Sequence, residues 1–488
     1  MTLRVLIDNS GPLPDRLREL VGVDRFAKLI FKRRTLAATI EQAAAAAGLE
    51  PPDTLDSHMD WARLAEQLQG EEQSEERFLV CPAGVVAGRG SKALIAFLQQ
   101  ARYSPQNLVL PARGGPEWGG WALMTSAVFG HYLNARAQGN LANFFECYRE
   151  QFVRLDGRLD LIDLSDEVTL LEFLSGTFDA RSFNAVESHA YTVTKTSVDK
   201  AKLDREFRYH QMLPESMQMF FVRPFDFIDL GKSAIYTMER LFVPDMAVQW
   251  LHGALTEIEF RRFLDQIFCF VSSRAKRAAA PGEAENVIET LLVEKVRDRV
   301  EALKGAAAYQ ILRPLIDRAC GSLDDLVGRY LALFGRMRRQ LPTDTMVIGH
   351  GDLCFSNILY AKTNRTMKLI DPRGAASEAD LWTHPYYDLA KLSHSILGNY
   401  DFVNQGMFDI HIDEDLRLRL VIDRPPPAWA STMFLGDTTR AGFSPNLVRL
   451  CEASLFISML PLHIDRPRNV LGFIVIATRI LDELERSE

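Results

Sequence analysis

The stretch Val347–Asp371, VIGHGDLCFSNILYAKTNRTMKLID, decides the fold of this 488-residue chain. An apolar run, Met346–Ile348, predicts a buried strand that leads directly into the triplet HGD. Asn357 follows across a tight loop, and two short β-like runs then form a hairpin that ends on Asp371. Polar residues at these positions, between short strands, make the stretch the candidate functional site.

Phosphoryl transfer is the chemistry that this spacing favours, because it needs few protein groups. One carboxylate must orient the acceptor hydroxyl and take its proton, and Asp352 suits that role. Oxygen ligands must hold Mg²⁺ against the phosphates, and Asn357 and Asp371 suit that role. Mg²⁺ prefers one or two carboxylates plus phosphate oxygens, so a sparse pair of ligands is expected. The alternative is that these are ordinary polar residues of turns.

The pattern HGDxxxxN, followed by an apolar strand that ends in Ile-Asp, resembles the aminoglycoside phosphotransferase and choline kinase family. The segment PYYDLA at 385–390 also resembles the part of that family that follows the metal-binding Asp. The resemblance covers the C-terminal two-thirds of the chain and implies the protein-kinase-like fold. The chain departs from the kinase pattern after Asp371, where Pro372-Arg373-Gly374 stands in place of Phe-Gly.

The resemblance implies a role for each matching residue. Asp352 would be the catalytic base, and Asn357 and Asp371 would be the metal ligands. His350 would brace the catalytic loop, and Asp388 would support that loop from the start of a helix.

A cation for the phosphates is expected upstream, in a small β-containing lobe. Lys195 lies near the end of the β-like run Tyr191–Ser197, and Glu206 follows in the predicted helix Lys200–Met212. A Lys–Glu ion pair of this kind holds the lysine over the α- and β-phosphates. A surface lysine and a surface glutamate are the alternative. The competitors for the two roles are Lys200, Lys202 and Glu187.

Further nucleotide contacts follow from the same resemblance. The run Ile235–Leu241 resembles the strand and hinge whose backbone receives the adenine, with Glu239 and Leu241 at the hinge. A core strand is the alternative. Arg373 would lie beside the phosphates, where its guanidinium could bind an anion through two hydrogen bonds; an outward-facing structural arginine is the alternative. No GxGxxG loop precedes the lysine, and the nearest candidate is Ser175–Asn184.

The N-terminal third lies outside this resemblance. Leu3–Asp8, Arg77–Pro82 and Asn107–Pro111 predict short strands, and the Ala-rich run Thr35–Gly48 predicts a helix. Strands that alternate with helices favour an α/β layer with a mostly parallel sheet. The pattern loosely resembles a sugar-nucleotidyltransferase domain, but its first turn lacks the glycine-rich loop that grips a triphosphate, so we interpret it as degenerate.

One loop in this region, Arg113–Trp121, is rich in glycine and carries two tryptophans. It suits a sugar or a protein partner, and tryptophans that cap a core are the alternative.

The predicted architecture is an α/β N-terminal domain with a Rossmann-like sheet, followed by an α+β two-lobed protein-kinase-like domain. The boundaries we expect are 1–165 for the N-terminal domain, 166–255 for the kinase-like small lobe and 256–488 for the helical large lobe.

Composition limits the classes of function. The formal net charge of −8 argues against nucleic acid as the main partner, since that role favours a basic face. Six cysteines without a CxxC pair suggest neither a zinc site nor a disulfide framework. No apolar run reaches the length of a membrane span, and the N-terminus has no apolar signal region. A cytoplasmic protein is expected.

The sequence therefore predicts a Mg²⁺-dependent small-molecule kinase that moves the γ-phosphate of ATP or GTP to a hydroxyl, with a sugar or an envelope precursor as candidate acceptor. One alternative is a bifunctional nucleotidyltransferase–kinase. Another is a nucleotide-sensing pseudokinase or scaffold. The acceptor, the preferred nucleotide and the oligomeric state, including a homo-oligomer, stay open.

Overall fold

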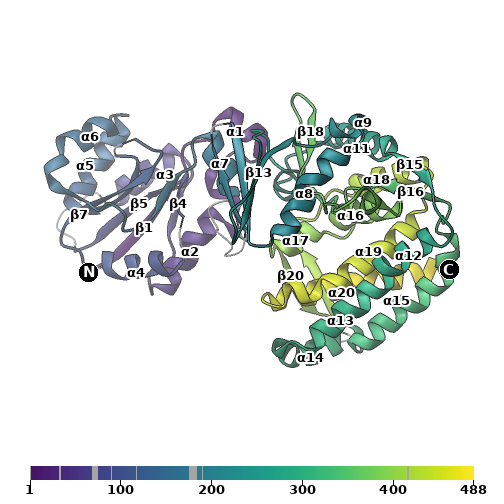
Figure 1. Ribbon diagram of the computed structural model, residues 1–488. Coiled ribbons are helices and arrows are strands. Elements are labelled where there is room, and N and C mark those ends of the chain that lie inside the picture. The colour runs from purple at the N-terminus through teal and green to yellow at the C-terminus, as the bar shows by residue number, and fades with distance from the viewer. Residues whose placement is uncertain are drawn as a thin grey trace. The chain divides into compact units, whose positions relative to one another are not determined.

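The computed structural model describes residues 2–31, 34–68, 75–88, 91–116, 118–174, 184–189, 191–414 and 417–487. The chain divides into two compact units, Met1–Asp179 and Ala180–Glu488, coloured purple to blue and teal to yellow in Figure 1. Each unit has its own sheet.

The first unit is built on an eight-stranded sheet. Its strands are β1 Leu3–Asp8, β4 Asp53–Leu55, β5 Arg77–Pro82, β6 Val85–Ala87, β7 Asn107–Arg113, β8 Gly120–Thr125, β9 Phe152–Arg154 and β10 Leu161–Asp163. Their order is β4-β1-β5-β8-β7-β10-β6, with β9 paired to β7. Four strand pairs of the sheet are parallel, whereas β8 runs antiparallel to both its neighbours and β6 runs antiparallel to β10. The sequence predicts a mostly parallel sheet, and the short connection between β7 and β8 is the reason for this departure, since a parallel pair needs a long crossover.

The predicted strand Leu3–Asp8 is β1, and its alternate residues face two different cores. Leu3, Val5 and Ile7 pack on one side of the sheet, and Leu6 packs on the other. Helices cover both sides, which explains why the strand is an unbroken apolar run. The helices of the two layers, visible in Figure 1, are α2 Leu36–Ala46 and α4 Ser91–Ala101 on one side, and α3 His58–Gln67, α5 Ser126–Ala137 and α6 Leu141–Cys147 on the other.

The glycine-rich loop with two tryptophans is the connection between β7 and β8. Trp121 is 1% exposed, and its Nε1–H donates to the Val85 carbonyl oxygen at 3.0 Å. Trp118 stacks on Phe145 with ring centroids 5.6 Å apart. Both rings are therefore engaged in packing within the first unit, which agrees with the core-capping alternative.

Helix α7 (Glu167–Leu174) lies beyond the predicted boundary at 165 but belongs to the first unit. Glu167 pairs with Arg16 at 2.6 Å, and Phe173 packs on Phe31 with ring centroids 4.1 Å apart. These contacts to the start of the chain explain why the compact unit extends to Asp179. The other short elements here are α1 Asp15–Val21, η1 Phe26–Lys28, β2 Ile30–Phe31, β3 Arg34–Thr35 and η2 Arg149–Gln151.

The second unit begins with a four-stranded antiparallel sheet of order β11-β12-β14-β13. The strands are β11 Asn184–Ser188, β12 Thr192–Ser197, β13 Pro224–Asp229 and β14 Ala234–Glu239. Helix α8 (Lys200–Met212) has the predicted bounds, and the Asp199 side chain caps its start by accepting the Lys202 N–H. Leu203 of α8 packs on Ala234 and Tyr236 of β14. The apolar face of α8 thereby fixes the helix on the sheet.

The rest of the second unit is mainly helical (Figure 1). Its central helix, α19, is buried on nearly all sides and lies against α16 and α20. The helices are α9 Glu215–Gln218, α10 Met246–Leu251, α11 Glu257–Ser273, α12 Glu283–Glu289, η3 Thr290–Glu294, α13 Lys295–Lys304, α14 Ala307–Cys320, α15 Leu323–Met337, η4 Arg338–Gln340, η5 Phe355–Asn357, η6 Glu378–Leu381, α16 Tyr386–Ile396, α17 Tyr400–Asn404, α18 Ala428–Arg440, α19 Pro445–Met459, η7 Leu460–His463 and α20 Pro467–Ser487.

Short strands carry the candidate site within this helical part. The strands are β15 Lys276–Ala278, β16 Thr345–Ile348, β17 Ile358–Ala361, β18 Thr366–Leu369, β19 Trp382–Thr383, β20 Phe408–Ile412 and β21 Leu418–Ile422. Strands β17 and β18 form the predicted hairpin. A mixed α/β sheet, then a small antiparallel sheet, then a helical part confirm the predicted fold class. Among the described residues, no helix combines the length and the apolar character needed to cross a membrane.

Candidate active site

Strand β16 leads into the HGD loop, residues 349–354, and a buried carboxylate fastens that loop. Asp388 lies in the first turn of α16 and is fully buried. It accepts the backbone N–H of His350 at 3.0 Å and that of Gly351 at 2.9 Å. The Tyr209 hydroxyl donates to the Gly349 carbonyl oxygen at 2.8 Å. Side chains from α8 and α16 therefore hold the loop backbone in one position.

A second buried group, Arg274 at the end of α11, neutralises Asp388. Its Nη1 lies 3.1 Å from Asp388 Oδ2, and its Nη2–H donates to the Pro385 carbonyl oxygen at 3.1 Å. Arg274 is 3% exposed. The segment that follows Arg274 is fixed as well, since Lys276–Ala278 pairs with β16. Burying a guanidinium is tolerable here because a carboxylate and carbonyl oxygens satisfy it.

We expect Arg274→Met to lower the free energy of unfolding by about 3–5 kcal/mol, because it leaves the Asp388 charge buried without a cation. Urea denaturation of the full chain measures this loss. Arg277→Met is the matched control, since Arg277 pairs with Glu283 on the surface and such pairs contribute at most about 1 kcal/mol. Equal losses in the two variants would contradict a bracing role for Arg274.

His350 links the HGD loop to the segment that carries Asp371. One ring nitrogen, Nε2, lies 2.9 Å from the Ile370 carbonyl oxygen, and Nδ1 accepts the Asp352 backbone N–H at 3.1 Å. This pattern requires the neutral tautomer with the proton on Nε2. Burial lowers the pKa of His350, which favours the neutral ring. His350 therefore ties the HGD loop to the segment that carries Asp371.

Asp352 and Asn357 lie together at the open side of the loop. The Asn357 side-chain amide donates to the Asp352 carbonyl oxygen at 2.8 Å and to Asp352 Oδ2 at 3.3 Å. Many protein atoms surround the Asp352 carboxylate, yet 45% of its side chain is open to solvent. A hydroxyl group of a small molecule can therefore reach it.

Lys391 of α16 pairs with the other oxygen of Asp352. Its Nζ lies 2.9 Å from Oδ1. Burial by itself would raise the pKa of Asp352, but the Lys391 ammonium outweighs burial and holds that pKa below its ordinary value. Asp352 is therefore ionised at neutral pH, as a proton acceptor must be.

Asp371 lies just after β18 with a left-handed backbone, φ +53°. That conformation is uncommon for a residue other than glycine, although Asp tolerates it better than most. The turn that follows explains the glycine of the Pro-Arg-Gly sequence. A Cβ at Gly374 would lie 2.7 Å from the Arg205 carbonyl carbon of α8, so only glycine fits there. This close approach brings the Asp371 segment onto α8.

Lys195 lies between Glu206 and Asp371. Its Nζ is 2.5 Å from Glu206 Oε2 and 3.0 Å from Asp371 Oδ1. Burial would lower the pKa of Lys195, but Asp371, Tyr236 and Glu206 outweigh burial and raise it, so the ammonium stays charged. Lys195 of the small sheet thus contacts Asp371 of the helical part. The Asp371 side chain is still 43% open to solvent.

The competing lysines and glutamate lie elsewhere. Lys200 pairs with Asp229 at the surface, and Lys202 approaches Glu206 only to 3.8 Å. Glu187 is an exposed residue of β11.

The other residues predicted to contact the nucleotide lie at the end of β14, before α10 and beside the HGD loop. Glu239 is the last residue of β14 and accepts the Arg223 backbone N–H at 3.3 Å. Leu241 follows in the irregular segment before α10 and is half-buried. Arg373 is exposed next to the HGD loop, and a Cβ at Gly351 would lie 2.6 Å from its Cβ. The candidate phosphate loop, Ser175–Asn184, lies almost entirely outside the described residues.

The oxygen donors present suit Mg²⁺ better than a metal that needs a full protein cage. No group of three or more His, Cys, Asp or Glu residues that could hold a metal occurs in the described parts of the chain. Asn357 and Asp371 are instead a sparse oxygen pair, tied together by the Ile370 N–H, which donates to the Asn357 carbonyl oxygen at 3.0 Å. Mg²⁺ that takes its remaining ligands from phosphates and water fits such a pair.

The turn after β1 in the first unit is filled by its own side chains. The Asp8 carboxylate lies 2.8 Å from Arg136 Nη2 and accepts the Ser10 hydroxyl at 2.7 Å. The Arg136 guanidinium in turn lies over the Trp61 ring, 4.0 Å from a ring centroid. The Asp8 carboxylate is therefore bound by side chains of the first unit.

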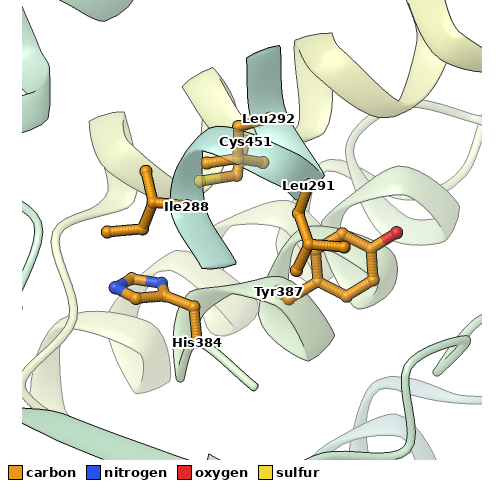
Figure 2. A pocket seen from close by; sticks show the side chains of 6 residues that line it. All are labelled: Ile288, Leu291, Leu292, His384, Tyr387 and Cys451. Carbon is orange, nitrogen blue, oxygen red and sulfur yellow. The ribbon is translucent and has the colours of Figure 1, made fainter. Parts of the chain in front are cut away.

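Figure 2 shows a separate apolar gap in the second unit, and it is not a ligand site. The gap is too small to hold a water molecule. The Tyr387 ring closes one side, and its hydroxyl oxygen points away from Cys451 and Ile288. The lining residues are Ile288, Leu291, Leu292, His384, Tyr387 and Cys451.

Sequence reasoning missed two charged residues of this site. Lys391 follows Asp388 by three positions on one helix, and that spacing places two residues on one face, so this signal was available. Arg274 carries no such signal, because its partner is 114 residues away.

Comparison with known proteins yields similar solved structures only, since neither a protein-family model nor a curated protein matches. One is spectinomycin phosphotransferase, APH(9)-Ia, in complex with ADP and spectinomycin. It is 11% identical with a TM-score of 0.38, over 63% of this chain and 91% of that one. A second is a thermostable mutant of aminoglycoside phosphotransferase APH(4)-Ia, 12% identical with a TM-score of 0.35, over 65% and 98%. A third is choline kinase from Cryptosporidium parvum Iowa II, 13% identical with a TM-score of 0.31, over 66% and 96%.

These TM-scores lie below 0.5, so no function is argued from these structures. The predicted resemblance of residues 1–165 to sugar nucleotidyltransferases finds no support in these comparisons. The similar solved structures named here are two aminoglycoside phosphotransferases and a choline kinase.

Proposed function

We propose that the chain is a Mg²⁺-dependent phosphotransferase that moves the γ-phosphate of ATP or GTP to a hydroxyl group of a small molecule. The observation that carries the proposal is the position of Lys195, whose Nζ lies 2.5 Å from Glu206 and 3.0 Å from Asp371. Kinases bind phosphates with a lysine held by a helix glutamate and with an aspartate that holds Mg²⁺, and Lys195, Glu206 and Asp371 lie together in that combination. A sugar or an envelope precursor is the candidate acceptor.

Each residue then has one task. Lys195 binds the α- and β-phosphates, and Glu206 holds its ammonium in place. Asn357 and Asp371 would hold Mg²⁺, which neutralises charge on the phosphates. Asp352 accepts the proton of the acceptor hydroxyl as its oxygen bonds to the γ-phosphorus and the bond to the bridging oxygen breaks. The segment around Glu239 and Leu241 would receive the base.

The two alternative functions predict different behaviour. A nucleotide-sensing pseudokinase or scaffold would bind MgATP without transferring phosphate. A bifunctional nucleotidyltransferase–kinase would need a triphosphate loop after β1, but Asp8 is paired with Arg136 there, and Pro12 and Pro14 lack the N–H groups that bind phosphates.

The test is a screen of MgATP and MgGTP consumption by the full chain with a panel of sugars and other hydroxylated metabolites. Formation of a phosphorylated product that depends on Mg²⁺ supports the proposal. Nucleotide binding without product from any acceptor, and without slow hydrolysis by water, would favour the pseudokinase.

The first unit should contribute no transfer chemistry. We expect Asp8→Asn in the full chain to change phosphotransfer turnover by less than about twofold, since Asp8 is paired with Arg136 and accepts from Ser10 and separate domains act largely independently. The assay is turnover at saturating MgATP together with the melting temperature. A large loss of turnover at an unchanged melting temperature would mean that the first unit takes part in catalysis.

A further inference from the structure

The two oxygens of Asp352 mark two sides of the site. Oδ2 faces Asn357, at 3.3 Å, and that is the metal and phosphate side. Oδ1 faces Lys391 of α16, at 2.9 Å. Because the acceptor must approach the base from the side away from the metal, the surroundings of Lys391 border the acceptor position.

A second lysine lies on this acceptor side. Lys295 begins α13, and its Nζ donates to the Tyr387 hydroxyl oxygen at 2.9 Å. Tyr387 precedes Lys391 by one turn of α16, so both lie on the same face of that helix. Lys391 pairs with Asp352 Oδ1 at 2.9 Å, so the face of α16 that carries Tyr387 also borders the base.

Tyr387 is buried, and its hydroxyl contacts Lys295. Its ring lies beside Leu291 and lines the apolar gap in Figure 2. The residue is 3% exposed. Burial would raise the pKa of Tyr387, but Lys391, Lys295 and Arg373 together outweigh burial and lower it. The Tyr387 hydroxyl therefore lies against the Lys295 ammonium, at 2.9 Å.

The carboxylates of the site do not balance this charge. Asp388 is paired with Arg274, and Asp371 is paired with Lys195. Asp352 faces Lys391. Among the described residues, Lys295 contacts the Tyr387 hydroxyl and ring but no carboxylate. A half-buried ammonium without a carboxylate partner favours the binding of an anion, because a charge-assisted hydrogen bond is strong.

We propose that the acceptor is a hydroxylated molecule that itself carries an anionic group, a phosphate or a carboxylate, and that Lys295 binds this group with help from Lys391. This rests on the proposed phosphotransferase function. The acceptor hydroxyl oxygen bonds to the γ-phosphorus, the nucleoside diphosphate leaves with the bridging oxygen, and the hydroxyl proton passes to Asp352. The anionic group remains on the Lys295 side throughout and takes no part in bond making.

Matched acceptor pairs test this in the full chain: glycerol with glycerol 3-phosphate, glucose with glucose 6-phosphate, and glycerol with glycerate. We expect product from the anionic members in preference to the neutral ones. Lys295→Met should raise KM for an anionic acceptor by about 10–100-fold, the worth of one charge-assisted hydrogen bond, with a smaller effect on kcat. Arg297→Met, an exposed change on the same helix, is the control. Preference for neutral members, or equal KM values in the two variants, would overturn the inference.

If no member of the panel is phosphorylated, inorganic phosphate is the probe. Thermal stabilisation of the MgADP-saturated protein by phosphate, at constant ionic strength, should be larger in the wild type and Arg297→Met than in Lys295→Met. Equal stabilisation in all three would overturn the inference. Failure of the wild type to bind MgADP by calorimetry is a different result, since it contradicts the phosphotransferase function itself.

Discussion

Asp352→Asn is expected to lower phosphotransfer turnover by about 10²–10⁴-fold, the usual contribution of a positioned general base. Asparagine has the same shape but cannot accept the hydroxyl proton. In the wild type, Lys391 at 2.9 Å keeps the Asp352 carboxylate ionised. This carboxylate is open to solvent, so a substrate can reach it. MgATP affinity should change little, because Lys195 and Asp371 are untouched. Steady-state turnover and calorimetry measure the two quantities.

A control variant shows whether the loss of any carboxylate lowers turnover. Asp298→Asn removes an exposed carboxylate of α13 and should leave turnover unchanged. Near-normal turnover in Asp352→Asn would rule out Asp352 as the base, even if the protein proves to be a kinase.

Asp371→Ala has the second large expected effect, a loss of more than about 100-fold in Mg²⁺-dependent nucleotide affinity. Changing a residue that only orients a metal ligand lowers metal affinity by about 10–100-fold, and removing the ligand itself should lower it further. Asp371 is the carboxylate of the proposed ligand pair, and it also pairs with Lys195 at 3.0 Å. Calorimetry with ADP, with and without Mg²⁺, measures the affinity.

Lys195→Met is the comparison for this variant. It removes a phosphate contact but no metal ligand, so nucleotide affinity should fall to a similar degree with and without Mg²⁺. Asp371→Ala should instead abolish the gain that Mg²⁺ provides. Unchanged MgADP affinity in Asp371→Ala would reject the metal assignment and favour a pseudokinase.

Local pattern was sufficient for the elements that carry the site. Helix α8 begins and ends at the predicted residues because Asp199 caps it and its apolar residues recur at helical spacing. The hairpin after Asn357 follows from two short β-like runs. In contrast, the antiparallel position of β8 depends on a connection whose tryptophans pack inside the unit. The strand alternation does not reveal that direction.

The sequence by itself determined the order of elements and the polar residues of the HGD loop, because capping, hydrophobic periodicity and short spacing act over a few residues. The tertiary structure alone decided the electrostatic environment of those residues. Arg274 meets Asp388 across 114 positions, and Lys195 meets Asp371 across 176. A lysine on a helix looks the same in sequence whether it lies in water or against a carboxylate. The free energy of its charge is set by burial and by partners that only folding brings together.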